Sequence, residues 1–234
     1  LRICEQEVRA LALPGHVLTI PIDVRDAYAC ERAVRATVDE FGRIDALVNN
    51  AGVGGRLISE TYNTDPVPFW QGDVDAWQQI IETNVLGAFY MARAAAPRMV
   101  KAGFGRIVSI STSPQTMVRR GYSPYGPSKA ALEAMTRIWS QDLEGTGVTA
   151  NILLPGGATD TDFIPRRLDA DRRGADGMLL PANIMNDALL WLLSDQSNAI
   201  TGRRFIGRLW DSSLAPSDAA QKAIQPTVDL PAIL

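Results

Sequence analysis

Several features that would place this chain in a well-known functional class are scarce or missing. It has one histidine, His16, and two cysteines, Cys4 and Cys30, with the spacing of neither a metal site nor a disulfide framework. No stretch approaches the roughly eighteen consecutive apolar residues of a membrane-spanning helix. No basic run stands out, and the net charge of −3 gives no general attraction to nucleic acid or to an anionic membrane. These absences favour a reduced, cytoplasmic protein without a metal, nucleic-acid or membrane partner.

The sequence does contain enough apolar residues for one sizeable core. It is 234 residues long, 46% hydrophobic and 21% charged, and no linker divides it. A single domain is therefore expected over residues 1–211. Residues 212–234 contain Pro216, Pro226 and Pro231, and they predict an extended C-terminal arm.

Segments with the period of a strand alternate with segments that have the period of a helix. This alternation predicts an α/β fold with a doubly wound parallel sheet, in which helices cover both faces and make three layers. Strands are expected at 17–23, 46–48, 106–110, 148–154 and 203–209, and helices at 28–41, 75–101, 124–144 and 183–193.

Two of the expected strands are followed by small, hydroxyl or amide side chains. Residues 49–52 read Asn-Asn-Ala-Gly, and residues 111–113 read Ser-Thr-Ser. Ligands of open α/β sheets bind at the carboxyl ends of the strands, and small residues let a ligand approach the backbone. Both strand ends are therefore candidate parts of a binding site.

Tyr125 and Lys129 lie in the opening turns of an expected helix, with Ser123 as its N-cap. A spacing of four residues puts the phenol and the ammonium group on one helix face. An unperturbed tyrosine has a pKa of about 10, and a nearby positive charge favours the phenolate. The pair is therefore a candidate for proton transfer, and an ordinary exposed helix face is the plainer interpretation of the same spacing.

Five short motifs follow one another in this sequence: Asn49-Asn50-Ala51-Gly52, Asn84-Val85-Leu86-Gly87, Ser111-Thr112-Ser113, Tyr125-x-x-x-Lys129 and Pro155-Gly156. In order and spacing they resemble the motifs of the short-chain dehydrogenase/reductase family. The resemblance implies a Rossmann-type fold, a bound NAD or NADP, and the oxidation of an alcohol or the reduction of a carbonyl compound. The alternative is a catalytically silent binding or scaffold protein on the same fold.

The resemblance also implies four catalytic residues. Tyr125 would transfer the proton, and Lys129 would lower the pKa of the phenol and hold the nicotinamide ribose. Asn84 would anchor a water in a proton relay. The spacing of the family selects Thr112, where serine is usual, as the hydroxyl that orients the substrate.

That last assignment leaves alternatives open. Ser111 or Ser113 takes the place of Thr112 if the loop before Tyr125 shifts the register. Likewise, either Thr159 or Thr161 would bond the carboxamide of the nicotinamide. Asp23 would contact the adenine ring, although the segment Asp23-Val24-Arg25-Asp26 could equally be an ordinary helix cap. The full set of expected cofactor-binding residues is Asp23, Val24, Asn50, Ala51, Gly52, Tyr125, Lys129, Pro155, Gly156 and Thr161.

The beginning of the sequence departs from the family pattern. Family members open with a strand, a glycine-rich turn, a helix and a second strand, whereas this sequence opens at Leu1 with what looks like the next helix. A strand-helix-strand unit of about 30 residues is therefore expected to be missing. Either upstream residues are omitted or the chain is a truncated relative with an impaired cofactor site. The residue that selects NAD or NADP falls in that unit, so this choice stays open, as does the substrate.

Self-association is a further expectation. The apolar faces of the helices at 75–101 and 124–144 are wider than one core requires. The resemblance implies that these two helices form a dimer interface. We therefore expect a homodimer or a homotetramer.

Overall fold

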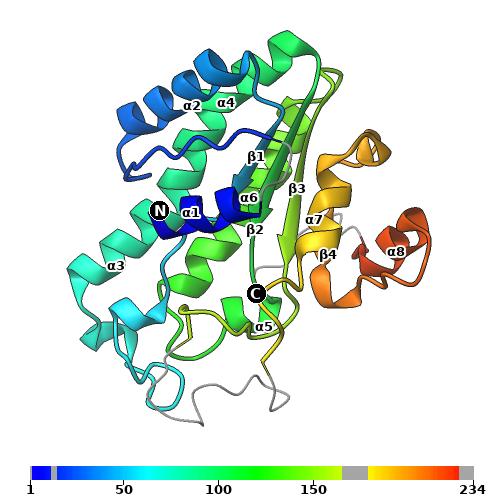
Figure 1. Ribbon diagram of the computed structural model, residues 1–234. Helices are drawn as coiled ribbons and strands as arrows, with labels where there is room; N and C mark the ends of the chain where they lie inside the picture. Colours follow the sequence, from blue (N-terminus) through cyan, green and yellow to red (C-terminus); the bar gives the residue numbers. More distant parts are fainter. Residues whose placement is uncertain (1, 12–14, 165–178, 227–234) are drawn as a thin grey trace.

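A sheet of four parallel strands forms the centre of the fold in a computed structural model that describes residues 2–11, 15–164 and 179–226 (Figure 1). The strands lie in the spatial order in which they occur in the sequence: β1 (Ala46–Asn49), β2 (Gly105–Ile110), β3 (Val148–Leu154) and β4 (Arg204–Ile206). One line of register runs through Asn49, Ser109, Ile152 and Arg204. Because all four strands are parallel, their carboxyl ends lie at one edge of the sheet.

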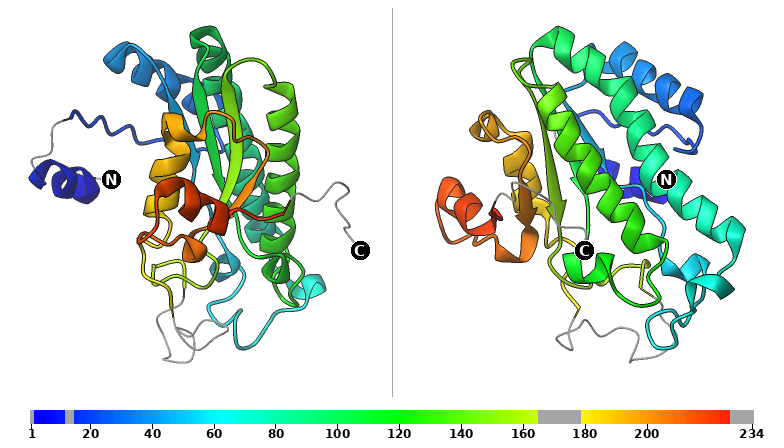
Figure 2. Two further views of the ribbon diagram at one scale, coloured as in Figure 1. Left: turned by 90° about the vertical axis from the view of Figure 1, so that its right-hand side faces the viewer. Right: turned by 180° about the vertical axis from the view of Figure 1, so that it is seen from behind.

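Helices cover both faces of this sheet, as Figure 2 shows from two sides. One face carries α4 (Ala88–Ala102) and α6 (Tyr125–Asp142), and α2 (Ala27–Phe41) packs against α4. The other face carries α7 (Asn186–Leu193) and α8 (Pro216–Ala223). This arrangement confirms the predicted Rossmann-type α/β fold with a doubly wound parallel sheet.

Alternating side chains of the strands build a core on each face. Ile107 of β2 packs with Ala95 and Met99 of α4, whereas the next residue, Val108, packs with Leu192 of α7. Successive side chains of a strand point to opposite faces of its sheet, so one strand serves both cores. The apolar runs in the sequence follow from this double burial.

The expected helix at 75–101 is present, but it is not uniform. It consists of α3 (Val74–Ile81), a π-helical segment (Glu82–Gly87) and α4. Asn84 lies in the π-helical segment and is only 1% exposed. Single π-helical turns are frequent at functional sites.

The strand expected at 17–23 was wrong. Residues 17–23 run without regular structure up to the turn before α2. A strand needs a neighbour that satisfies its backbone N–H and C=O groups, and none of the four strands pairs with this segment. The final strand is also shorter than predicted, because β4 ends at Ile206 and the 3-10 turn Gly207–Leu209 follows.

The C-terminal segment is not the extended arm that its prolines predicted. Pro216 is the first residue of α8, where the missing N–H of proline has no helical partner to lose. Ala220 and Ala223 of α8 are buried against Trp191 and Phe205. The small alanine side chains let α8 lie close to α7, so residues 216–223 extend the core. Residues 227–234 of the expected arm lie outside the described residues.

Two further α-helices are short. They are α1 (Arg2–Ala10) at the beginning and α5 (Pro114–Met117) after β2. Among the helices that the structure describes, none has both the length and the apolar character needed to cross a bilayer.

Candidate active site

The loops that follow β1, β2 and β3 meet the first turns of α6 at the carboxyl edge of the sheet (Figure 1). Tyr125 is the first residue of α6, and Lys129 lies one turn further along it. The residue before the helix is Pro124, which provides no side-chain cap, so the helix begins one residue later than expected and Ser123 is not its N-cap.

The hydroxyl of Thr112, on the loop after β2, lies close enough to the phenol of Tyr125 to influence its pKa. Burial of the phenol disfavours its charged form and raises the pKa of Tyr125 to about 12, while the hydroxyl of Thr112 acts in the opposite direction. Tyr125 is therefore protonated at neutral pH. A protonated phenol of this kind can donate a proton or a hydrogen bond.

Lys129 is buried beside this phenol. Its Nζ lies 5.9 Å from the centre of the Tyr125 ring and donates a hydrogen bond to the carbonyl oxygen of Ile110 at 2.8 Å. Burial lowers the pKa of Lys129 to about 8, because a buried ammonium group loses its hydration. The expected fall in the pKa of Tyr125 is absent from this structure, since burial of the phenol has the larger effect.

Asn84 joins the loop after β1 to α6. Its Oδ1 accepts a hydrogen bond from the N–H of Val53 at 2.9 Å, and its Nδ2 donates to the carbonyl oxygen of Val53 at 2.9 Å and to Ser128 Oγ at 3.0 Å. A Cβ added to Gly52 would lie 3.3 Å from Asn84 Oδ1 and 3.6 Å from Lys129 Nζ. The structure therefore brings Gly52, Asn84 and Lys129 together.

The three hydroxyl groups after β2 have different surroundings. Ser111 is buried, and its Oγ donates to Glu133 Oε1 at 2.6 Å. Ser113 is the N-cap of α5 and accepts a hydrogen bond from the N–H of Thr116 at 3.2 Å. Of the three, Thr112 is the one that the structure places against Tyr125.

The predicted adenine-contacting turn lies near the π-helical segment. The carboxylate of Asp23 pairs with Arg25 at 2.6 Å, and this pair lowers the pKa of Asp23. The N-cap of α2 is Asp26, so the segment 23–26 does cap this helix as the alternative expected, although Asp23 itself is not the cap. Val24 packs on Gly87, where an added Cβ would come within 2.7 Å of Val24 Cγ2.

Asn50 and Ala51 lie in the turn that follows β1. Both are exposed, and the N–H of Asn50 donates to the carbonyl oxygen of Val48 at 2.9 Å. The turn leads directly to Gly52 beside Lys129. These residues therefore line the same edge as the Tyr125 site.

The loop after β3 is held against the residues that follow β4. The carbonyl oxygen of Pro155 accepts a hydrogen bond from the N–H of Arg208 at 3.0 Å. Gly156 has a φ of +92°, and an added Cβ would come within 2.5 Å of Ile206 Cγ2, so glycine is required here. Thr161 Oγ1 accepts from the N–H of Phe163 at 3.4 Å, a contact within the loop.

The structure adds residues that the sequence did not single out. The ring of Phe163 lies 5.5 Å from that of Tyr125 and covers Gly54, where no side chain would fit. Phe163 is the first residue of the charged segment 163–178, for which the sequence also predicts a lid over the substrate, and 165–178 lie outside the described residues. Glu133 and Arg204 are also close to the loop after β2. Glu133 could have been noticed, because it lies four residues after Lys129 on the same helix face.

The fold and this site define a class of protein: a Rossmann-like α/β protein that places a tyrosine, a lysine and a hydroxyl group at the carboxyl edge of a parallel sheet. Residues 2–206 match the protein family described as enoyl-(acyl carrier protein) reductase. A short-chain type dehydrogenase/reductase from Picea abies is 44% identical over 124 residues, which are 53% of this chain and 43% of that protein. The chain thus spans less than half the length of the Picea abies protein.

Two further comparisons cover more of both chains. The 3-oxoacyl-(acyl-carrier-protein) reductase FabG of Thermotoga maritima is 30% identical over 198 residues, which are 83% of this chain and 76% of that protein. The crystal structure of a dehydrogenase/reductase from Sinorhizobium meliloti 1021 matches with a TM-score of 0.71 and 30% identity, and the match covers 87% of this chain and 77% of that one. The chain therefore belongs to the short-chain dehydrogenase/reductase family.

Proposed function

We propose that this protein is an oxidoreductase that transfers a hydride between a nicotinamide cofactor, NAD or NADP, and a small alcohol or carbonyl substrate. The observation that carries the proposal is the half-buried phenol of Tyr125, which lies beside the hydroxyl of Thr112 and the ammonium group of Lys129. The names of two relatives, a dehydrogenase/reductase and a reductase, agree with this reaction class.

The residues around Lys129 fit the nicotinamide end of such a cofactor. Gly52 leaves open the space where a side chain would meet Lys129 Nζ, so a ligand can reach the ammonium group across the backbone. Lys129 and Tyr125 would hold the ribose, and the loops at 50–52 and 155–156 would flank the ring. When bound, the cofactor supplies or accepts the hydride.

In this mechanism Tyr125 moves the proton. During carbonyl reduction the carbonyl carbon gains the hydride, and the phenol of Tyr125 gives its proton to the carbonyl oxygen. The hydroxyl of Thr112 orients that oxygen beside the phenol. Because Tyr125 has a pKa of about 12, it holds its proton at neutral pH, which is the form that carbonyl reduction requires of a proton donor. The water relay expected at Asn84 stays a prediction.

A binding titration and a turnover assay test the proposal. NADH and NADPH are titrated separately against the fluorescence of the five tryptophans, and their oxidation is then followed by absorbance with a panel of small ketones and aldehydes. We expect saturable binding of at least one cofactor and oxidation that depends on the carbonyl compound. Binding without turnover over the whole panel would instead support the silent alternative, and no binding would reject the cofactor.

Replacing Phe163 with alanine is expected to weaken substrate binding more than it slows the reaction. The Phe163 ring packs beside Tyr125 and gives the site an apolar wall. Loss of part of the apolar area of one aromatic ring raises KM by about tenfold for an apolar carbonyl substrate, with kcat little changed. Steady-state kinetics measure both constants. The control is Phe69→Ala, which removes a ring that is 74% exposed and lies elsewhere in the chain. Equal KM values for the two variants would contradict the proposal that Phe163 forms an apolar wall of the site.

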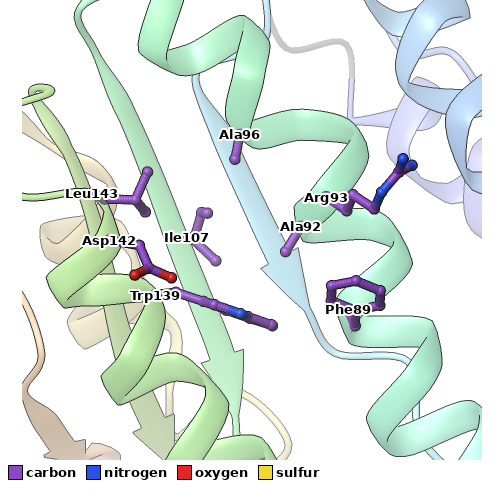
Figure 3. Close-up of a pocket in the computed structure, with 8 residues that line it drawn as sticks. All are labelled: Phe89, Ala92, Arg93, Ala96, Ile107, Trp139, Asp142 and Leu143. Carbon is purple, nitrogen blue, oxygen red and sulfur yellow. The ribbon is translucent and has the colours of Figure 1, made fainter.

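We also propose that the protein forms a homodimer or a homotetramer through α4 and α6. A hollow lies between these helices, with Ile107 of β2 at its floor (Figure 3). Apolar side chains dominate its lining, and Arg93 and Asp142 supply opposite charges from the two helices. Exposed apolar surface of this kind is typical of an interface between protein chains. The lining residues are Phe89, Ala92, Arg93, Ala96, Ile107, Trp139, Asp142 and Leu143.

A charge placed on this face is expected to separate the subunits. Ile138 lies one turn before Asp142 on α6 and is 56% exposed, so Ile138→Glu leaves the core intact. We expect the oligomer of the wild type to become a monomer, as measured by light scattering after gel filtration. Leu190→Glu on α7, at an exposed leucine on the opposite face of the sheet, is the matched control. An unchanged mass for Ile138→Glu would count against this interface.

A further inference from the structure

Three charged side chains hold the short segment 110–112, which leads from β2 into the site. Lys129 Nζ donates a hydrogen bond to the carbonyl oxygen of Ile110 at 2.8 Å. Glu133 Oε1 accepts a hydrogen bond from the hydroxyl of Ser111 at 2.6 Å. Arg204 Nη2 donates a hydrogen bond to the carbonyl oxygen of Thr112 at 2.8 Å. Each residue of the segment is therefore fixed by a different side chain.

Arg204 reaches this segment from a distant strand. It belongs to β4, which pairs with β3, and β3 in turn pairs with β2. Its Nε also donates to Glu133 Oε1 at 3.0 Å, and the two side chains are only 20% and 24% exposed. A guanidinium group can make both bonds at once because its donors lie in one rigid plane. Arg204 thereby links β4, α6 and the end of β2.

The same helix face carries the proposed proton donor. Tyr125, Lys129 and Glu133 follow one another at intervals of four residues along α6. Thr112, whose carbonyl oxygen accepts a hydrogen bond from Arg204, is also the residue whose hydroxyl lies beside the phenol of Tyr125. The position of that hydroxyl relative to the phenol consequently depends on the two hydrogen bonds that the Arg204 guanidinium donates.

We propose that Arg204 and Glu133 are positioning residues of the active site, which hold Thr112 at the distance from Tyr125 that proton transfer requires. Neither side chain need touch the substrate. The proposal rests on the proposed function only in its kinetic consequence. A misplacement on the order of 1 Å at a reacting group can slow a reaction by about a hundredfold.

Arg204→Gln tests this role, with Arg203→Gln as the matched control. Arg203 is the preceding residue, and its guanidinium donates to the carbonyl oxygen of Gln225 at 3.2 Å, away from the segment 110–112. The first measurement is hydrogen exchange in the free chain, where the N–H of Ser111 is bonded to the carbonyl oxygen of Leu153. We expect exchange in the segment to speed up by about tenfold in Arg204→Gln and to stay unchanged in Arg203→Gln.

The second measurement separates positioning from a merely structural role. We expect kcat to fall by about a hundredfold in Arg204→Gln, with the KM of the cofactor and the thermal midpoint close to those of Arg203→Gln. Arg204→Lys keeps the charge but not the planar fork, so it should recover part of kcat. It also serves as the test variant if Arg204→Gln does not fold. Combining Arg204→Gln with Glu133→Gln should add little further loss, because the two residues act as a unit.

The outcomes are distinguishable. If Arg204→Gln matches Arg203→Gln in exchange and in kcat, the inference is overturned. It is also overturned if kcat falls only in proportion to a lost thermal midpoint and weaker cofactor binding. If the wild type has no turnover, the proposed function fails, while the exchange measurement still decides whether Arg204 holds the segment.

Discussion

Tyr125→Phe will reduce kcat by about a thousandfold while leaving the fold unchanged, and it will weaken cofactor binding far less because Lys129 still holds the ribose. General acid catalysis by a positioned side chain contributes about 10²–10⁴ in rate, and phenylalanine has no proton to give. The ring itself stays, so its packing against Phe163 at 5.5 Å is preserved. Single-turnover oxidation of the reduced cofactor measures the loss at the chemical step.

A neighbouring tyrosine provides the control for this variant. Tyr122 lies three residues before Tyr125, and its hydroxyl donates to Asn63 Oδ1 at 2.6 Å. Tyr122→Phe removes the same atom, but it should keep a rate close to that of the wild type. If Tyr125→Phe retains more than about a tenth of the wild-type kcat, another group must supply the proton.

The parts of this molecule that could be predicted are those with local causes. The pair Tyr125 and Lys129 depends on the four-residue spacing of one helix, and the loops at 49–52 and 111–113 follow apolar strands that the sequence marks clearly. Because the strands are parallel, these loops meet at one edge without any further information. The Rossmann-type fold and the approximate place of the site were accordingly predictable.

The parts that could not be predicted depend on residues far apart in the sequence. Glu133 and Arg204 are separated by 71 positions, and only the order of the strands brings them together. The segment 17–23 has the composition of a strand, yet strand formation depends on a neighbour that local sequence does not reveal. Pro216 begins a helix because α7 offers a surface for the alanines of α8. In each case the structure is determined by contacts between distant parts of the chain, which the local sequence pattern does not show.

The direction in which the pKa of Tyr125 shifts could not be predicted from the sequence, for a related reason. A nearby positive charge and burial act in opposite directions on a phenol, and the spacing of residues reports only the first. In the structure burial has the largest effect on the pKa of Tyr125 and raises it, and burial also lowers the pKa of Lys129 to about 8. Burying the ammonium group of Lys129 therefore costs folding free energy. Groups with shifted pKa values of this kind are common at sites where proteins transfer protons.

Lys129→Met is expected to lose activity and to change how the free energy of unfolding depends on pH. Removing the ammonium group beside Tyr125 is expected to lower kcat by about a hundredfold or more. In the wild type, burial lowers the pKa of Lys129 from 10.5 to about 8. At about 1.36 kcal/mol for each pH unit, the buried charge disfavours the folded state by about 3 kcal/mol below pH 8.

The sign of the pH effect follows from proton uptake. Below pH 8 both the folded and the unfolded wild type hold this proton, and the cost of the buried charge is present in full. Between pH 8 and pH 10.5 the folded state releases the proton while the unfolded state keeps it, so the free energy of unfolding contributed by Lys129 rises with pH. Methionine carries no proton, and Lys129→Met should lack this rise.

Urea unfolding of both proteins at pH 7 and at pH 10.5 measures the difference. At pH 7 the gain from removing the charge is partly offset by about 1–3 kcal/mol for the carbonyl oxygen of Ile110, which loses its hydrogen bond. The wild type should therefore gain on Lys129→Met by about 3 kcal/mol as the pH rises, whatever their order at pH 7. Lys101→Met, at an exposed lysine on α4, should show no such change. Parallel pH curves for the wild type and Lys129→Met would mean that Lys129 is fully solvated, and the buried proton site inferred here would be lost with it.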